Sequence, residues 1–150
     1  MRLTLVNFII AALLFIPLFS IEQAHAKTNE RPAVLVTGAS SGIGYRIATQ
    51  LADNGFFVYA GARKKADIEQ LNASPNSQGL QLDVTMQDDI EQAVQTVENG
   101  GRGLYGLVNN AGVALFDSLI EISEDDMQFL MDVNLFGPYR ITKAFAPLIM

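Results

Sequence analysis

The chain has 150 residues, a formal net charge of −6, one His and no Cys. The length favours one domain, and the excess of acidic over basic side chains argues against a nucleic-acid partner, which needs clustered Lys and Arg. The lack of Cys excludes disulfides and thiolate chemistry, and His25 lies near the N-terminus, so the body of the chain has no imidazole for a Ser-His-Asp triad or a His-based metal site. No metal ligands are therefore assigned.

The first 26 residues have the features of an export signal. Arg2 is followed by an apolar run from Phe8 to Phe19, and Ala24-His25-Ala26 supplies small residues at the −3 and −1 positions of a cleavage site. Residues 1–26 are predicted to be a signal peptide, with a membrane anchor through residues 3–21 as the alternative. We expect export to a periplasm or secretory lumen, or membrane anchoring; a cytoplasmic enzyme with a misassigned start is the other alternative.

Beyond the leader, apolar runs alternate with helical patterns. Strands are predicted over residues 33–36, 56–60, 80–84 and 104–108. Helical patterns lie at residues 45–52 and 66–71, between Thr85 and Asn99, and from Ser123 to the end of the chain. Thr85 and Asp88 have the spacing of a capping box, and acidic residues follow Ser123, as a helix N-terminus favours. This alternation predicts an α/β domain over residues 33–150, with a doubly wound parallel sheet.

A glycine-rich loop, Thr37-Gly38-Ala39-Ser40-Ser41-Gly42-Ile43-Gly44, joins the first strand to the first helix. Glycines here let the backbone approach a pyrophosphate, which the N–H groups of the following helix can bind. The spacing G-x-x-x-G-x-G differs from the common G-x-G-x-x-G fingerprint. In isolation, the loop is equally consistent with a tight strand-to-helix turn.

Four motifs in order resemble those of the short-chain dehydrogenase/reductase family: the loop TGASSGIG, Asp83-Val84, Asn109-Asn110-Ala111-Gly112, and Asn134. The resemblance spans residues 33–150 and implies a Rossmann-type fold whose first four strands lie in the order 3-2-1-4. It also implies that Asp83 contacts adenine, that Asn110 lies against a ribose while Asn109 helps to hold the sheet, and that Asn134 is catalytic. The cofactor-binding residues so assigned are Thr37, Gly38, Ser40, Ser41, Gly42, Ile43, Gly44, Asp83, Val84, Asn110, Ala111 and Gly112.

The end of the second strand bears on the choice of nicotinamide cofactor. It reads Ala60-Gly61-Ala62-Arg63-Lys64-Lys65, without the carboxylate that holds the ribose 2′-hydroxyl in NAD enzymes. Arg63 can bind a 2′-phosphate through its guanidinium group. The cluster could instead be the solvated start of a helix, although cations are unfavourable there. The sequence therefore favours NADP(H), with NAD(H) possible.

Pro138 lies four residues after Asn134 and lacks the N–H that would donate to the Asn134 carbonyl in an α-helix. We therefore expect a helix kink and a free carbonyl. In the family that the chain resembles, the backbone of this Asn holds a water of the proton relay. A bend without catalytic meaning is the alternative.

The resemblance also implies residues that the chain lacks. The family's Tyr-x-x-x-Lys follows a further strand, whereas the literal match Tyr139 to Lys143 lies within the last predicted helix. We therefore expect this chain to be the N-terminal half of an enzyme that acts on a small-molecule alcohol or carbonyl compound. Alone, it should be unstable and nearly inactive, and the edge of its fourth strand should be exposed. The apolar last helix would contribute to a homo-oligomer. A non-catalytic dinucleotide-binding module is the alternative; Arg63 and Asn109-Asn110 count against a Rossmann-like methyltransferase.

Overall fold

A computed structural model describes residues 31–116 and 118–149. The predicted leader, residues 1–26 with the alternative anchor at 3–21, lies outside the described residues. Among the helices within these ranges, none has both the length and the apolar character needed to cross a membrane.

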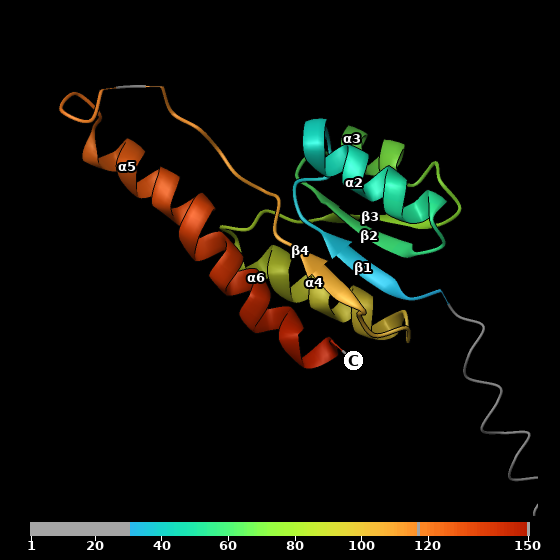
Figure 1. Ribbon diagram of the computed structural model, residues 1–150. Coiled ribbons are helices and arrows are strands. Elements are labelled where there is room, and N and C mark those ends of the chain that lie inside the picture. The colour runs from blue at the N-terminus through green and yellow to red at the C-terminus, as the bar shows by residue number, and fades with distance from the viewer. Residues whose placement is uncertain (1–30, 117, 150) are drawn as a thin grey trace, which may run out of the picture. The chain divides into compact units, whose positions relative to one another are not determined.

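Strands and helices alternate along the described chain (Figure 1). The sheet is parallel throughout, in the order β3-β2-β1-β4, which confirms the predicted Rossmann-type topology. The elements are β1 (Ala33–Val36), α2 (Gly42–Asp53), β2 (Phe57–Ala62), α3 (Lys65–Leu71), β3 (Ser77–Gln81), α4 (Gln87–Asn99), β4 (Gly106–Val108), α5 (Glu124–Met131), the π-helical turn η1 (Asp132–Phe136), α6 (Gly137–Phe145) and the 3-10 turn η2 (Ala146–Leu148).

Helices cover both faces of the sheet, because successive side chains of a buried strand point to opposite sides. Leu35 of β1 belongs to a core cluster that includes Ile90 of α4 and Ile141 of α6. Val34 and Val36 belong to a second cluster with Ala48 of α2 and Leu71 of α3. Figure 1 shows α2 and α3 on one side of the strands, and α4 and α6 on the other. The carboxyl ends of the parallel strands consequently share one edge, where ligands bind in such sheets.

The third strand begins earlier than predicted, at Ser77 rather than Leu80, and ends at Gln81. Its residues pair with Val58 to Ala62 of β2. Because β3 is an edge strand, its backbone can pair while its side chains stay polar. The apolar pattern therefore found only its last two residues and placed its end three residues too late, at Val84. Asp83 and Val84 therefore follow the strand and lie in the loop before α4.

The predicted capping box at Thr85 is wrong. Helix α4 begins at Gln87 after the N-cap residue Met86, whose side chain makes no capping hydrogen bond. The N–H and hydroxyl of Thr85 both donate to Asp83 Oδ1, at 2.9 and 2.7 Å. This local turn orients Thr85 toward Asp83, and the helix starts later.

The final helix starts as predicted, since Ser123 Oγ accepts a hydrogen bond from the N–H of Asp126 at 3.1 Å. It is also predicted to kink at Asn134, where the structure has a π turn, and to run to the end of the chain, whereas α6 ends at Phe145. The π turn η1 separates α5 from α6, and the N–H of Gly137 donates to the carbonyl of Asp132 five residues earlier. Pro138, which has no N–H, follows directly, so the helix accommodates the missing donor by widening.

The end of α6 also changes the fourth strand. Pro147 cannot donate to the Lys143 carbonyl, and the helix gives way to η2 after Phe145. The N–H of Leu104 then donates to the Leu148 carbonyl at 2.8 Å, and Leu104 forms a parallel bridge with Ile149. Leu104 thus pairs outside the sheet strands, and β4, Gly106–Val108, is shorter than the predicted 104–108.

Candidate active site

A cavity of about 330 Å³ lies where the loops after β1, β2, β3 and β4 meet. It is lined by every cofactor-binding residue predicted from the sequence except Thr37 and Gly42. Residues from five separate stretches of the chain, the four loops and the later helical stretch at Val133, are therefore brought together around one hollow. The wall also contains four apolar residues for which the motifs gave no signal: Ala62, Leu82, Val113 and Val133.

The glycine loop turns sharply into α2. Gly38 has a φ of +64° and Gly42 a φ of +55°, a left-handed conformation that glycine adopts without steric cost. A Cβ on Gly42 would meet no atom within 4 Å, whereas a Cβ on Gly44 would collide with the Gly38 carbonyl oxygen and Asn110 Nδ2. Ser41, the N-cap residue of α2, makes no side-chain capping hydrogen bond. The loop is thus closely packed underneath and open at the helix N-terminus, which suits an anionic ligand.

Thr37 lies beneath the cavity rather than in its wall, at 1% exposure. Its Oγ1 donates to the Val108 carbonyl at 3.4 Å and accepts from the N–H groups of Asn110 and Ala111, each at 3.0 Å. One buried hydroxyl therefore joins the end of β1 to the chain leaving β4. Its position explains why a threonine opens the loop motif.

The two asparagines after β4 have different partners. Asn110 Nδ2 donates to the carbonyls of Thr37 and Gly38, at 3.0 and 3.1 Å, and so holds the glycine loop. Asn109 Nδ2 donates to Thr142 Oγ1 of α6 at 3.0 Å. Asn109 thus ties the strand end to the helix that covers it.

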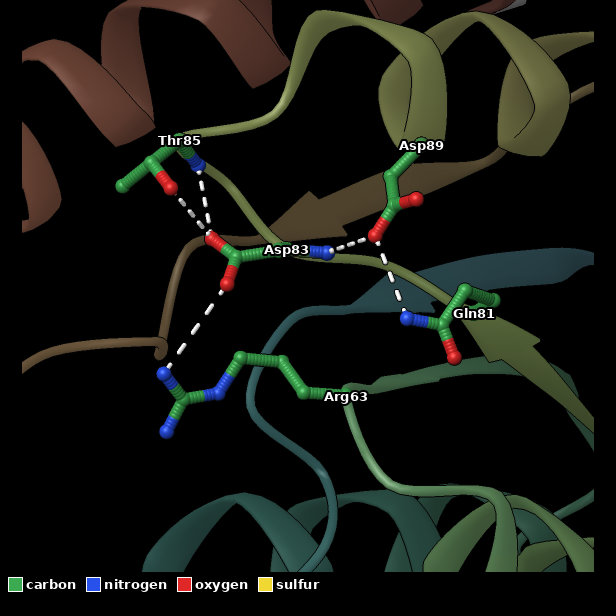
Figure 2. A network of polar contacts seen from close by, with 5 residues as sticks. All are labelled: Arg63, Gln81, Asp83, Thr85 and Asp89. Carbon is green, nitrogen blue, oxygen red and sulfur yellow. Dashed lines mark hydrogen bonds and ion pairs between the residues drawn. The ribbon is translucent and has the colours of Figure 1, made fainter.

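Asp83 lines the cavity and is the centre of a polar network (Figure 2). Thr85 occupies its Oδ1, while its Oδ2 lies 3.9 Å from a guanidinium nitrogen of Arg63. Asp89 Oδ2 accepts hydrogen bonds from the Asp83 N–H at 2.9 Å and from Gln81 Nε2 at 3.3 Å. Sequence reasoning missed Asp89, because a carboxylate in the first turn of a helix is already explained by the helix dipole. The network holds Asp83 in place with Oδ2 facing Arg63.

Arg63 reaches from the end of β2 toward Asp83, as Figure 2 shows. Its side chain is 63% exposed and that of Asp83 is 25% exposed. At 3.9 Å the pair is a loose ion pair in contact with solvent, a kind that contributes at most about 1 kcal/mol. The guanidinium group can therefore be drawn to an incoming anion at small cost.

Asn134 lies in the π turn and pairs with the chain after the NNAG motif. Its Nδ2 donates to the Val113 carbonyl at 2.8 Å, and its Oδ1 accepts from the Val113 N–H at 2.9 Å. The side-chain amide thus acts as a short strand partner for Val113, a cavity-lining residue. Tyr139 and Lys143, the literal Tyr-x-x-x-Lys match, do not line the cavity, and Lys143 Nζ lies 5.8 Å from the centre of the Tyr139 ring.

The π turn is braced by a second pair of side chains. Arg140 donates to Asp132 Oδ1 at 2.8 Å, and its other terminal nitrogen lies 3.5 Å from the Asp132 carbonyl oxygen. Both side chains are about one-third exposed. The guanidinium group therefore bridges the start of the π turn and the first turns of α6, where Pro138 supplies no backbone donor.

We expect Arg140→Met and Asp132→Asn each to lower the free energy of unfolding by about 1 kcal/mol, because the pair is only partly shielded from water. In a double-mutant cycle measured by urea denaturation, the double variant should be scarcely less stable than either single variant. Lys143→Met is the matched control on the same helix and should change stability by less than about 0.5 kcal/mol. If the two losses in the free energy of unfolding were additive in the double variant, the contact between Arg140 and Asp132 would not stabilise the turn.

Comparisons with known proteins agree with this geometry. The model of the short chain dehydrogenase family matches residues 32–150. The mitochondrial D-beta-hydroxybutyrate dehydrogenase of Rattus norvegicus is 38% identical over 137 residues, covering 85% of this chain and 39% of that protein. Retinol dehydrogenase 5 of Mus musculus is 34% identical over 146 residues, covering 94% of this chain and 46% of that protein. This chain thus spans less than half the length of these curated relatives.

Solved structures show the same similarity. A short-chain dehydrogenase from Streptomyces avermitilis matches with a TM-score of 0.74 and 31% identity, over 81% of this chain and 45% of that chain. An alcohol dehydrogenase from Thermococcus sibiricus, complexed with 5-hydroxy-NADP, matches with a TM-score of 0.73 and 31% identity, over 79% of this chain and 53% of that chain. The chain therefore belongs to the short-chain dehydrogenase family of NAD(P)-binding oxidoreductases. This assignment decides against the methyltransferase alternative.

Proposed function

We propose that this chain binds NADP(H) and forms the cofactor-binding half of an oxidoreductase that interconverts a small alcohol and a carbonyl compound by hydride transfer. The observation that carries the cofactor preference is Arg63, whose exposed guanidinium group lines the cavity just after β2. A 2′-phosphate can displace the loose contact with Asp83 and accept hydrogen bonds from this group. The alcohol dehydrogenase relative complexed with 5-hydroxy-NADP supports the same preference.

The cavity residues fit the parts of such a cofactor. The open N-terminus of α2, with the glycine loop before it, suits a pyrophosphate. Asp83 Oδ2 can accept a hydrogen bond from the adenine amino group, because Thr85 occupies only Oδ1. Asn110, whose Nδ2 holds the loop, offers Oδ1 as an acceptor for a ribose hydroxyl. The bound cofactor supplies or receives the hydride.

Asn134 has a second role in this proposal, through its backbone. Pro138 cannot donate to the Asn134 carbonyl, and the side-chain amide is committed to Val113. The side chain therefore fixes the position of the π turn, and the carbonyl, which lacks its i+4 donor, can accept a hydrogen bond from a water in a proton relay. On this proposal, Asn134 serves proton transfer without being the group that protonates the substrate.

The exposed side of the last helices supports a further part of the proposal, a homo-oligomer. Phe129, Leu135 and Tyr139 are 44%, 52% and 59% exposed, while Val133 and Ile141 on the same helical stretch are buried. The stretch is thus apolar on its outer as well as its inner side, which is typical of a helix that packs against another subunit.

Arg63→Met tests the cofactor assignment, because it removes the guanidinium group and keeps most of the aliphatic stem. We expect the wild-type protein to bind NADPH more tightly than NADH, and the variant to lose about ten- to a hundredfold in NADPH affinity, since hydrogen bonds to charged groups contribute about 1.5–3 kcal/mol. The NADH affinity should change less than about twofold. Isothermal titration calorimetry with both cofactors measures the difference.

Arg46→Met is the matched control, because Arg46 is an exposed cation of α2 that does not line the cavity. It should leave both affinities unchanged. Tighter binding of NADH than of NADPH by the wild-type protein would refute the preference for NADP(H).

A further inference from the structure

Arg63 borders two hollows, as do Ser40 and Ser41. It lines the main cavity, and it also lines a second one of about 350 Å³, together with Ser40, Ser41, Lys64 and Asp67. We call this second cavity the outer hollow. The group that would bind a 2′-phosphate is therefore accessible from two sides. Whatever charge lies in the outer hollow acts on the same guanidinium group.

The outer hollow contains a carboxylate as well as cations. Lys64 is the N-cap residue of α3, and Asp67 follows three positions later. Residues three apart lie on the same face of a helical turn, so the fold brings Asp67 to the side of Lys64 and Arg63. Asp67 is half-buried, whereas both cations are exposed. The segment from Ala60 to Lys65, at the end of the second strand, contains no acidic residue. Asp67 lies beyond this segment, and only the folding of α3 brings its carboxylate into the same hollow as Arg63.

Arg63 thus has an acidic residue in each hollow, Asp83 in the main cavity and Asp67 in the outer one. A 2′-phosphate near Arg63 would be attracted by the cations and repelled by Asp67. A ribose 2′-hydroxyl at the same place carries no charge and would be almost indifferent to Asp67. Asp67 therefore acts on one cofactor and scarcely on the other.

We propose that Asp67 is a specificity-determining residue that weakens the preference for the 2′-phosphorylated cofactor. The proposal rests on the proposed function, because it assumes that adenine nucleotides bind in the main cavity with their 2′-position near Arg63. The positive charges of Arg63 and Lys64, set against the negative charge of Asp67, then determine how strongly the phosphorylated cofactor is preferred. Removing the charge of Asp67 should sharpen the discrimination between the two cofactors.

The test uses Asp67→Asn with two nucleotide probes that differ only in the group concerned, adenosine 2′,5′-bisphosphate and adenosine 5′-monophosphate. We expect the variant to bind the bisphosphate about two- to fivefold more tightly, the range for a partly exposed charge pair, and the monophosphate with unchanged affinity. Raising the salt concentration should reduce the gain. Glu69→Gln is the matched control, since it removes an exposed acid of the same helix that does not line the outer hollow.

Each outcome has one meaning. An unchanged ratio of the two affinities in Asp67→Asn overturns this inference, and it leaves the proposed function standing if the wild-type protein still prefers the bisphosphate. An equal gain for both probes, or the same gain from Glu69→Gln, reveals a general effect of net charge and also overturns it. Failure of the folded wild-type protein to bind either probe overturns the proposed function together with the inference.

Discussion

Gly44→Ala is expected to destabilise the protein by about 3 kcal/mol and to abolish adenine nucleotide binding. The added Cβ would collide with the Gly38 carbonyl oxygen and with Asn110 Nδ2. Those two groups are hydrogen-bonded to each other at 3.1 Å, so neither can move without breaking the contact that holds the loop. Overpacking at such a site costs about 1–3 kcal/mol or more. Urea denaturation and calorimetric titration with NADPH measure the two effects.

Gly55→Ala separates crowding from backbone strain. Gly55 has a φ of +90°, and a Cβ there would meet no atom within 4 Å. This control should cost about 1–2 kcal/mol through the left-handed conformation alone and leave nucleotide binding intact. If Gly44→Ala proved as stable as the wild type and still bound NADPH, the close packing inferred for the loop would be incorrect.

Thr37→Val is expected to lower the free energy of unfolding by about 3 kcal/mol, although valine has nearly the same shape as threonine. The substitution removes the acceptor for the N–H groups of Asn110 and Ala111 in a position that is 1% exposed. Each unsatisfied buried donor costs about 1–3 kcal/mol. Because these donors shape the cavity wall after β4, NADPH affinity should fall as well.

Thr37→Ser keeps the hydroxyl and loses only a methyl group, which contributes about 1 kcal/mol. It should therefore be clearly more stable than Thr37→Val in the same urea titration, and it should retain nucleotide binding. Equal stability of the two variants would mean that the hydroxyl does not hold the loop in solution.

Elements that are completely buried were predicted more accurately than elements at the edge of the sheet. Strand β1 was predicted to the residue, because Ala33 to Val36 are all buried and form an uninterrupted apolar run. The first three residues of β3 were missed, because an edge strand is held by backbone pairing that leaves no mark on its side chains. Helix interiors were found from apolar spacing, whereas the start of α4 depended on a single hydroxyl that Asp83 engages instead.

From Pro138 the sequence predicts that the helix is disturbed, but not the form that the disturbance takes. The missing N–H could be read from the sequence, and it predicted a disturbance of the helix at Asn134. The widening into a π turn could not be predicted, because it depends on which residues brace the turn afterwards. The contact between Arg140 and Asp132 spans eight positions and forms only once the turn has its observed geometry.

For the candidate site, sequence analysis identified eleven of the fifteen residues of the cavity wall but not the contacts between them. The motifs gather because the carboxyl ends of parallel strands share one edge. Asp67 and Asp89 were missed for one reason. Each is a carboxylate in the first turn of a helix, where the helix dipole explains an acid without any further role.

The stretch from Asn110 to Val113 is fastened at both ends. Thr37 and Asn110 fix its beginning to the loop that starts α2, and Asn134 fixes its end to the helices on the opposite side of the sheet. This short stretch therefore connects the two helical layers through hydrogen bonds, and its residues also line the cavity. A shift of the α5–α6 stretch, such as contact with another subunit would bring, would reach the cavity wall through the pair formed by Asn134 and Val113.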